Sequence, residues 1–180
     1  MNSLLPILCA CVDTKFVSVS GIVAWAENLV MRIPEPQYWL LELTGSRTAE
    51  DALRVLHEKR SHDCIVSDDQ YGALCVGLWY LRFVRGEITY SDLEGGVTDD
   101  VDAYPFEEFD IEYFQAQFSR AGPQLDPDSE LGRILRTCGD LAERSFSYAF
   151  SDDVLSKERA LLDSAAVGIS GIFAGPVGTQ

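Results

Sequence analysis

The chain has 180 residues, of which 47% are apolar, so a substantial hydrophobic core is expected and disorder of the whole chain is excluded. Its formal net charge of -15 opposes binding to nucleic acid or to anionic membranes, because like charges would have to approach closely. A basic protein is the expected kind of partner.

The first predicted helix spans residues 4–12 and ends near Asp13. Its apolar run is short, is interrupted by Pro6 and follows no basic residue, so it does not have the pattern of a signal peptide. No other segment reaches the length of about 20 apolar residues that a membrane-spanning helix requires. We therefore expect a cytoplasmic protein that does not enter a membrane.

Three further helices are predicted in the first third of the chain. Ser18 or Ser20 is expected to cap the first of them, whose apolar residues recur at helical spacing. Two prolines end it, and residues 37–44 are expected to form a short helix. Residues 48–51 then have the pattern TAED, which predicts a capping box at the start of the third.

The most apolar helix is predicted over residues 69–85, and we expect it to be the central helix of the fold. After a short extended link, Ser91 and Glu94 have the spacing of another capping box. This order of apolar helix, link and capped helix repeats that of residues 4–30, so that positions 19–22 match positions 90–93. Either an ancient duplication or chance in a helix-rich chain explains the repetition.

The second half of the chain is also predicted to be helical. Pro105, Asp126-Pro127 and Ser151 are expected to start three helices, whereas Gly95-Gly96 weakens the helix before them. The segment 167–180 is rich in glycine and apolar residues, and we expect it to be loosely docked or disordered.

The predicted fold is all-α. Only residues 16–19 and 88–90 are candidate strands, and neither alternates for long enough to predict a sheet. We expect about seven to nine helices in one domain over residues 1–166, arranged as a single bundle or as two packed lobes.

Acidic and aromatic residues alternate between Glu87 and Glu130, a segment with thirteen acids and one base. Regularly spaced rings bury apolar area and so hold the acids on a folded surface, which attracts a cationic partner. We expect that partner to contact two tyrosines and nine acids of the segment. These are Tyr90, Asp92, Glu94, Asp99, Asp100, Asp102, Tyr104, Glu107, Glu108, Asp110 and Glu112.

The sequence lacks the residue patterns of familiar active sites. Adjacent acids such as Asp99 and Asp100 point about 100° apart on a helix, so they do not converge on a substrate. A calcium loop would need glycine where Tyr104 stands. The two histidines have no nucleophile motif or second ligand pair beside them, and five dispersed cysteines fit reduced thiols. We expect no enzyme activity, no metal and no cofactor.

The first third of the chain resembles the amino-terminal pattern of small helical immunity proteins from bacterial polymorphic toxin systems. The resemblance is carried by VSVSGIVAWAENLV and PEPQYWLLELTGSRTAEDALRVL, in which the matching residues are Trp25-Ala26-Glu27, Pro36, Trp39-Leu40-Leu41 and Ala49-Glu50-Asp51. Most of these are packing residues. The resemblance implies a cytoplasmic protein that binds and neutralises a toxin domain without a cofactor.

Charge and resemblance lead to the same functional hypothesis. We interpret the chain as an acidic inhibitor, an immunity protein whose negative field speeds its encounter with a basic, nuclease-like toxin domain. A non-catalytic helical regulatory or scaffold module and a small helical enzyme that uses acidic residues are the alternatives. Binding that resists high salt would favour the module. Loss of an activity with intact binding, after one acid is changed, would favour the enzyme.

Overall fold

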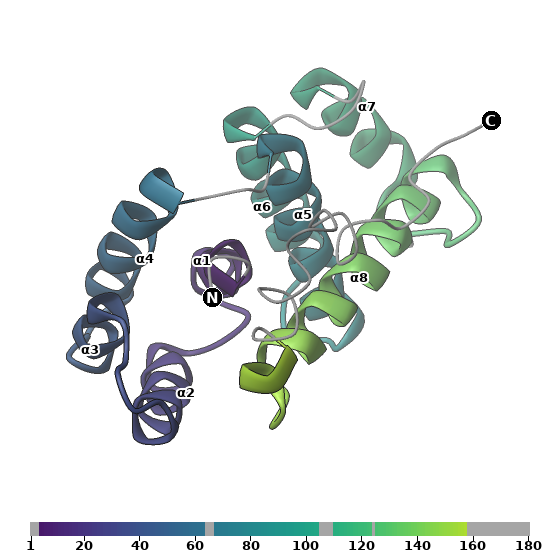
Figure 1. The fold of residues 1–180 in the computed structure, drawn as a ribbon. Coiled ribbons are helices and arrows are strands. Elements are labelled where there is room, and N and C mark those ends of the chain that lie inside the picture. Colours follow the sequence, from purple (N-terminus) through teal and green to yellow (C-terminus); the bar gives the residue numbers. More distant parts are fainter. Residues whose placement is uncertain (1–3, 64–66, 105–109, 124, 158–180) are drawn as a thin grey trace. The chain divides into compact units, whose positions relative to one another are not determined.

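The computed structural model describes residues 4–63, 67–104, 110–123 and 125–157 (Figure 1). Every regular element within these ranges is helical, which confirms the all-α prediction, and the segments 16–19 and 88–90 form no strand. The described residues form eight helices and a helical turn at 154–157. The helices are α1 (Leu4–Asp13), α2 (Val19–Arg32), α3 (Tyr38–Thr44), α4 (Ala49–Asp63), α5 (Asp68–Val84), α6 (Tyr90–Ala103), α7 (Ile111–Ala121) and α8 (Glu130–Ala149).

Contacts between residues divide the chain into two compact units. Among the described residues, the first unit holds α1 to α4 and the chain from residue 146 to 157, which includes the last residues of α8. The second unit lies between residues 67 and 145, and holds α5 to α7 and most of α8. The predicted domain boundary at residue 166 lies outside the described residues.

Helix starts in the first unit follow the predicted caps. The Ser18 hydroxyl accepts a 3.2 Å hydrogen bond from Gly21 N, so Ser18 rather than Ser20 caps α2. The Thr48 hydroxyl accepts from Asp51 N at 3.1 Å, and the Asp51 carboxylate accepts from Thr48 N at 3.2 Å. This reciprocal pair is the predicted capping box, and it uses N–H groups that a helix start otherwise leaves unpaired.

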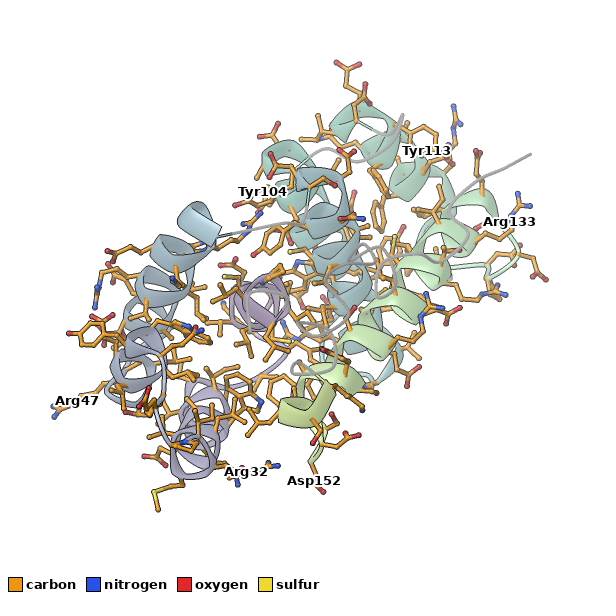
Figure 2. The ribbon with its side chains drawn as sticks, in the orientation of Figure 1. Arg32, Arg47, Tyr104, Tyr113, Arg133 and Asp152 are labelled. Atoms are coloured by element: carbon orange, nitrogen blue, oxygen red, sulfur yellow. The ribbon has the colours of Figure 1, made fainter. Side chains whose placement is uncertain are left out.

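Residues that follow position 145 complete the first unit. Trp25 Nε1 donates a 2.9 Å hydrogen bond to Ala149 O, and its ring packs against Phe150 with centroids 5.9 Å apart. Arg32 reaches the carbonyl of Asp152 at 2.6 Å (Figure 2). The end of α8 and the segment that follows it therefore hold α2 in place.

In the second unit, close helix packing depends on glycines of α5 and α6. A side chain at Gly77 would overlap the Cys138 carbonyl on α8, and one at Gly96 would overlap the Trp79 ring. Gly95, in contrast, faces open space. The pair Gly95-Gly96 does not stop α6, which continues to Ala103. The second glycine allows α6 to approach α5 closely.

The core of the second unit consists of side chains from α5 to α8. Its buried members are Val76, Leu93, Val97, Val101, Phe114, Phe118, Leu131, Leu135 and Cys138. Two rings from α7, Phe114 and Phe118, lie in this core among the aliphatic residues, with their centroids 6.5 Å apart. Burial of the α7 rings confirms that at least part of the aromatic segment packs inward and supports the acids around it.

The predicted start of α6 is wrong by a short distance. The capping box is formed by Thr89 and Asp92, not by Ser91 and Glu94. Thr89 N donates to the Asp92 carboxylate at 2.9 Å, and Asp92 N donates to the Thr89 hydroxyl at 3.2 Å. A carboxylate that accepts from backbone N–H at a helix start is favoured by both charge and dipole.

The predicted starts of the next two helices are also displaced. α7 begins at Ile111 with Asp110 as its cap, beyond Pro105, and residues 105–109 lie outside the described ranges. α8 begins after the turn that contains Asp126-Pro127, where the Ser129 hydroxyl accepts from Gly132 N at 3.0 Å. In both cases a side chain nearer the helix supplies the acceptor that the first turn needs.

The last predicted helix is described only at its beginning. Val154 N donates to Ser151 O at 3.2 Å, and residues 154–157 are helical. Lys157 Nζ lies 2.8 Å from Asp153 Oδ1 and 3.2 Å from the Ser151 hydroxyl. The rest of that helix and the segment 167–180 lie outside the described residues.

Candidate partner-binding surface

Negative charge is divided unevenly between the two units. Residues 67–145 contain 17 acids and 6 arginines or lysines, which is a formal net charge of -11. The remaining residues contain 12 acids and 8 arginines or lysines, a net charge of -4. The second unit, which holds the predicted partner-binding residues, therefore carries most of the negative charge.

Helix α6 presents carboxylates on one side and apolar side chains on the other. Leu93, Val97 and Val101 recur once per turn and are buried in the core of the second unit. Asp99 and Asp102 are exposed, and neither takes part in an ion pair with another described residue. Because the buried side anchors the helix, these two carboxylates are presented from a rigid element.

Two other predicted acids serve as helix caps. Asp92 accepts hydrogen bonds from the hydroxyl and N–H of Thr89, and these bonds hold the pKa of the Asp92 carboxyl below its usual value. Asp110 Oδ1 accepts from Tyr113 N at 2.8 Å. Both carboxylates are exposed, so they add to the negative field while they stabilise α6 and α7.

Asp100 is held by a tryptophan from α5. Trp79 Nε1 donates a 2.6 Å hydrogen bond to Asp100 Oδ2, and Gly96 on α6 lies against the same ring. The Arg82 guanidinium lies 5.2 Å from the ring centroid, with its Nε 3.5 Å from Glu87 Oε2. These contacts fix α6 on α5 and assign Asp100 a structural role.

The two predicted contact tyrosines pack within the second unit. The Tyr90 hydroxyl donates to Phe118 O at 2.7 Å, and burial raises the pKa of that hydroxyl. The Tyr104 ring, at the end of α6, packs edge-on against Tyr71 with centroids 4.8 Å apart (Figure 2). Both side chains are half-buried, so packing alone accounts for their presence.

The remaining predicted acids divide into described and undescribed residues. Glu94 is half-buried and Glu112 is exposed. Glu107 and Glu108 lie outside the described residues. Among the eleven predicted residues, Asp99 and Asp102 on α6 together with Glu112 on α7 are thus the exposed acids that the structure describes and that do not act as helix caps.

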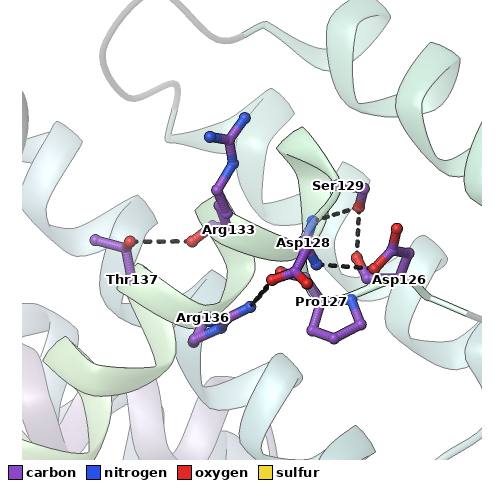
Figure 3. A network of polar contacts seen from close by, with 8 residues as sticks. Asp126, Pro127, Asp128, Ser129, Arg133, Arg136 and Thr137 are labelled. Carbon is purple, nitrogen blue, oxygen red and sulfur yellow. Dashed lines mark hydrogen bonds and ion pairs between the residues drawn. The ribbon is translucent and has the colours of Figure 1, made fainter.

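A polar network at the start of α8 uses further acids of this segment (Figure 3). Asp128 N donates to Asp126 Oδ1 at 2.9 Å, and the Ser129 hydroxyl donates to Asp126 O at 2.6 Å. The Arg136 guanidinium donates to Pro127 O and lies 3.7 Å from Asp128 Oδ1. The network closes the turn before α8 and places a positive charge beside Asp128.

No family model, curated protein or solved structure matches the chain. Within the residues that the structure describes, no helix has the length and apolar character needed to cross a membrane.

The first unit exposes large apolar side chains that sequence reasoning missed. Met31 at the end of α2 is 86% exposed, and Tyr38 and Leu41 on α3 are 73% and 44% exposed. Each belongs to a helix that also carries buried apolar residues, such as Leu29 and Leu40. Helical spacing carries a partial signal, because neither Met31 nor Leu41 follows a buried residue of its helix by three or four positions.

The first unit contains a histidine–aspartate contact and a buried thiol. His57 Nε2 lies 3.4 Å from Asp13 Oδ2 in the first unit. Burial raises the pKa of the Cys11 thiol to about 12, which keeps it protonated and unreactive. In the ranges that the structure describes, no three histidine, cysteine, aspartate or glutamate side chains are grouped so that they could hold a metal ion.

Proposed function

We propose that the protein is an acidic inhibitor that binds a basic protein, and specifically an immunity protein that neutralises a nuclease-like toxin domain. The observation that carries this proposal is the net charge of -11 on the second unit, where Asp99 and Asp102 project from a helix anchored by its buried side. The resemblance of the first third of the chain to immunity proteins supports the same function.

The physical mechanism is charge complementarity. A nuclease must present cationic side chains to bind phosphate, and carboxylates held at suitable spacing can occupy the same positions. The long-range field would raise the association rate by about 10- to 1,000-fold over a neutral surface at low salt. Single exposed ion pairs contribute only about 0.2–1 kcal/mol, so affinity requires several of them together with partly desolvated contacts.

Rigidity of α6 supports this mechanism. Each side chain or loop that must be ordered on binding costs about 0.5–1.5 kcal/mol, so a helix already fixed in place binds more tightly. Trp79 and the Thr89–Asp92 capping box fix α6 within the second unit before any partner arrives. Asp92 and Asp100, which cap and pack α6, therefore hold the exposed Asp99 and Asp102 in position for contact.

The test uses capture of partners from a lysate of the source cells by the immobilised protein, at low and high salt, with bound chains identified by mass spectrometry. The binding variant is Asp99→Asn with Asp102→Asn, which leaves Asp100 and its bond to Trp79 intact. The matched control is Glu42→Gln with Glu50→Gln, which removes the same charge from exposed positions of the first unit.

We expect the wild-type protein and the control to retain the same basic protein, more weakly as salt rises, and the α6 variant to retain much less. Capture of an acidic or neutral chain would contradict the charge mechanism. Equal capture by both variants would remove Asp99 and Asp102 from the binding surface.

A regulatory or scaffold binding module is the second candidate, and the exposed apolar residues of the first unit favour it. Met31 and Tyr38 expose apolar area, which a partner could cover without any charged contact. Binding through them would persist at high salt. We expect Met31→Ser with Tyr38→Ser to abolish capture under this alternative, and to leave it unchanged if the partner binds through α6.

A further inference from the structure

We infer that residues 4–32 and 75–103 are two versions of one structural motif, here called the helical corner. Each consists of a helix, a five-residue link and a second helix. The first corner joins α1 to α2 through residues 14–18, and the second joins the end of α5 to α6 through residues 85–89. Both second helices have 14 residues. The same shift in residue number relates the helix ends of the two corners: position 13 corresponds to 84, position 19 to 90 and position 32 to 103. This shift is called the common offset below.

The same backbone hydrogen bond ends the first helix in both corners. Thr14 N donates to Ala10 O at 3.0 Å, and Arg85 N donates to Leu81 O at 3.0 Å. Donor and acceptor are both shifted by the common offset. The helix is therefore terminated at the same point in the two corners.

The residue that turns the chain has the same unusual conformation in both corners. Lys15 has φ of 55° and Gly86 has φ of 71°. Lys15 N donates to Val12 O at 3.0 Å and Gly86 N donates to Phe83 O at 2.9 Å, again at the common offset. Lys15 is the only residue other than glycine with positive φ among the described residues, so the link imposes a conformation that its sequence does not favour.

The second helix is capped at the same position. The Ser18 hydroxyl accepts from Gly21 N, and the Thr89 hydroxyl accepts from Asp92 N, both at 3.2 Å. Cap residues and donors again differ by the common offset. A hydroxyl at the last position of the link is thus a shared requirement of the two corners.

Burial along the second helices also corresponds. Ile22 and Leu93 are equivalent and buried, as are Ala26 and Val97. Between these pairs, the equivalent positions 24 and 95 are both exposed. The match covers the first two turns; beyond them the buried apolar residues are Leu29 in α2 and Val101 in α6, which are not equivalent positions.

Side-chain identity is almost absent from this correspondence. Ser20 matches Ser91 and Val30 matches Val101, and no other residue is identical between the two corners. Exposed Met31 corresponds to exposed Asp102. The acidic surface is therefore a property of the second corner alone, whereas the backbone geometry belongs to both.

One backbone hydrogen bond differs between the links. Cys11 O accepts from Val17 N, whereas Arg82 O, its equivalent, accepts from Glu87 N, one position earlier than the offset requires. The acceptors correspond and the donors differ by one position. The middle of the link therefore tolerates variation, while the turn before it and the cap after it do not.

The test replaces the second link by the first. Residues 85–89 are changed from RGEIT to TKFVS in one variant and to TGFVS in another, which restores glycine at position 86. The control inserts IPEPQ, the equally long segment of residues 33–37 between α2 and α3. That control places proline, whose φ is fixed at about −65°, at the position that needs positive φ.

We expect TGFVS to unfold cooperatively at close to the wild-type urea midpoint, and TKFVS at a lower midpoint with unchanged helical circular dichroism. We expect IPEPQ to lose the cooperative transition. If TGFVS behaves like IPEPQ, the two links are not interchangeable and the inference fails. It also fails if IPEPQ unfolds like the wild type, because the link geometry would then not matter.

Discussion

Trp79 Nε1 donates a 2.6 Å hydrogen bond to Asp100 Oδ2, whereas the adjacent Asp99 is exposed and has no ion pair among the described residues. Two consecutive acids of the same segment therefore have different tasks. One attaches α6 to α5, and the other remains available to a partner. Sequence alone cannot separate them, because the donor lies 21 residues away in the chain.

Removal of the Trp79 donor should destabilise the protein. We expect Trp79→Phe to lower the free energy of unfolding by about 1.5–3 kcal/mol, since the bond has a charged acceptor. Trp25→Phe is the matched control, because Trp25 donates to the neutral carbonyl of Ala149 and its bond should contribute about 0.5–1.5 kcal/mol. Urea denaturation measures both. A larger loss in Trp25→Phe would argue against the charge-assisted bond.

The two adjacent glycines of α6 should respond in opposite directions to alanine. Gly95 faces open space, so Gly95→Ala should stabilise the protein by up to about 1 kcal/mol through helix propensity. Gly96→Ala would place a methyl group in the Trp79 ring and should cost about 1–3 kcal/mol. Chemical denaturation of the two variants decides the matter, and effects of the same sign would disprove the packing of Gly96 on Trp79.

The left-handed residues of the two links should also respond oppositely. Lys15→Gly should raise the free energy of unfolding by about 0.5–1 kcal/mol, because glycine adopts positive φ without steric cost. Gly86→Ala should lower it by about 1 kcal/mol or more, for the same reason. Thermal unfolding monitored by circular dichroism measures both changes. A loss of stability in Lys15→Gly would contradict the assigned backbone conformation.

The two capping boxes should make stability depend on acidic pH. Hydrogen bonds at Asp51 and Asp92 hold the pKa of each carboxyl below its value in the unfolded chain, about 3.9. Their stabilisation is therefore fully present above about pH 4 and is lost as pH falls through the lower, folded-state pKa.

We expect Asp92→Asn to be less stable than the wild type at neutral pH, and the difference to disappear as pH falls through the lowered pKa of the folded Asp92 carboxyl. The melting temperature measured across this pH range provides the test, with Asp51→Asn as a second example. Asp99→Asn is the control, because the exposed Asp99 caps no helix. A difference between Asp92→Asn and the wild type that stays constant with pH would show that the lost stability does not come from the ionised cap.

Sequence reasoning predicted the class of the fold well, because helical periodicity and caps are local properties. Ser18 and the Thr48–Asp51 box were found from neighbouring residues alone. It failed where two acceptable start signals compete within a few residues, as Thr89 and Ser91 do before α6. The position of the preceding turn decides between them, and that turn depends on a positive φ at Gly86.

The candidate surface was predicted less completely, because charge is visible in a sequence but contacts between distant residues are not. The concentration of acids in the second unit follows directly from composition. The bond of Tyr90 to Phe118 O, 28 residues away, does not, and neither does the exposure of Met31. Local patterns identify which residues are charged, and packing determines which of them remain free.

The first unit is assembled from segments far apart in the sequence, and this affects the order in which the protein folds during synthesis. Trp25 bonds to Ala149 and Phe16 packs against Phe146, so the segment 1–66 leaves the ribosome before its partners exist. At typical translation rates the intervening segment takes roughly 4–16 s to synthesise. The second unit, continuous from residue 67 to 145, can complete its core in that interval, so the segment made first is the last to find its final contacts.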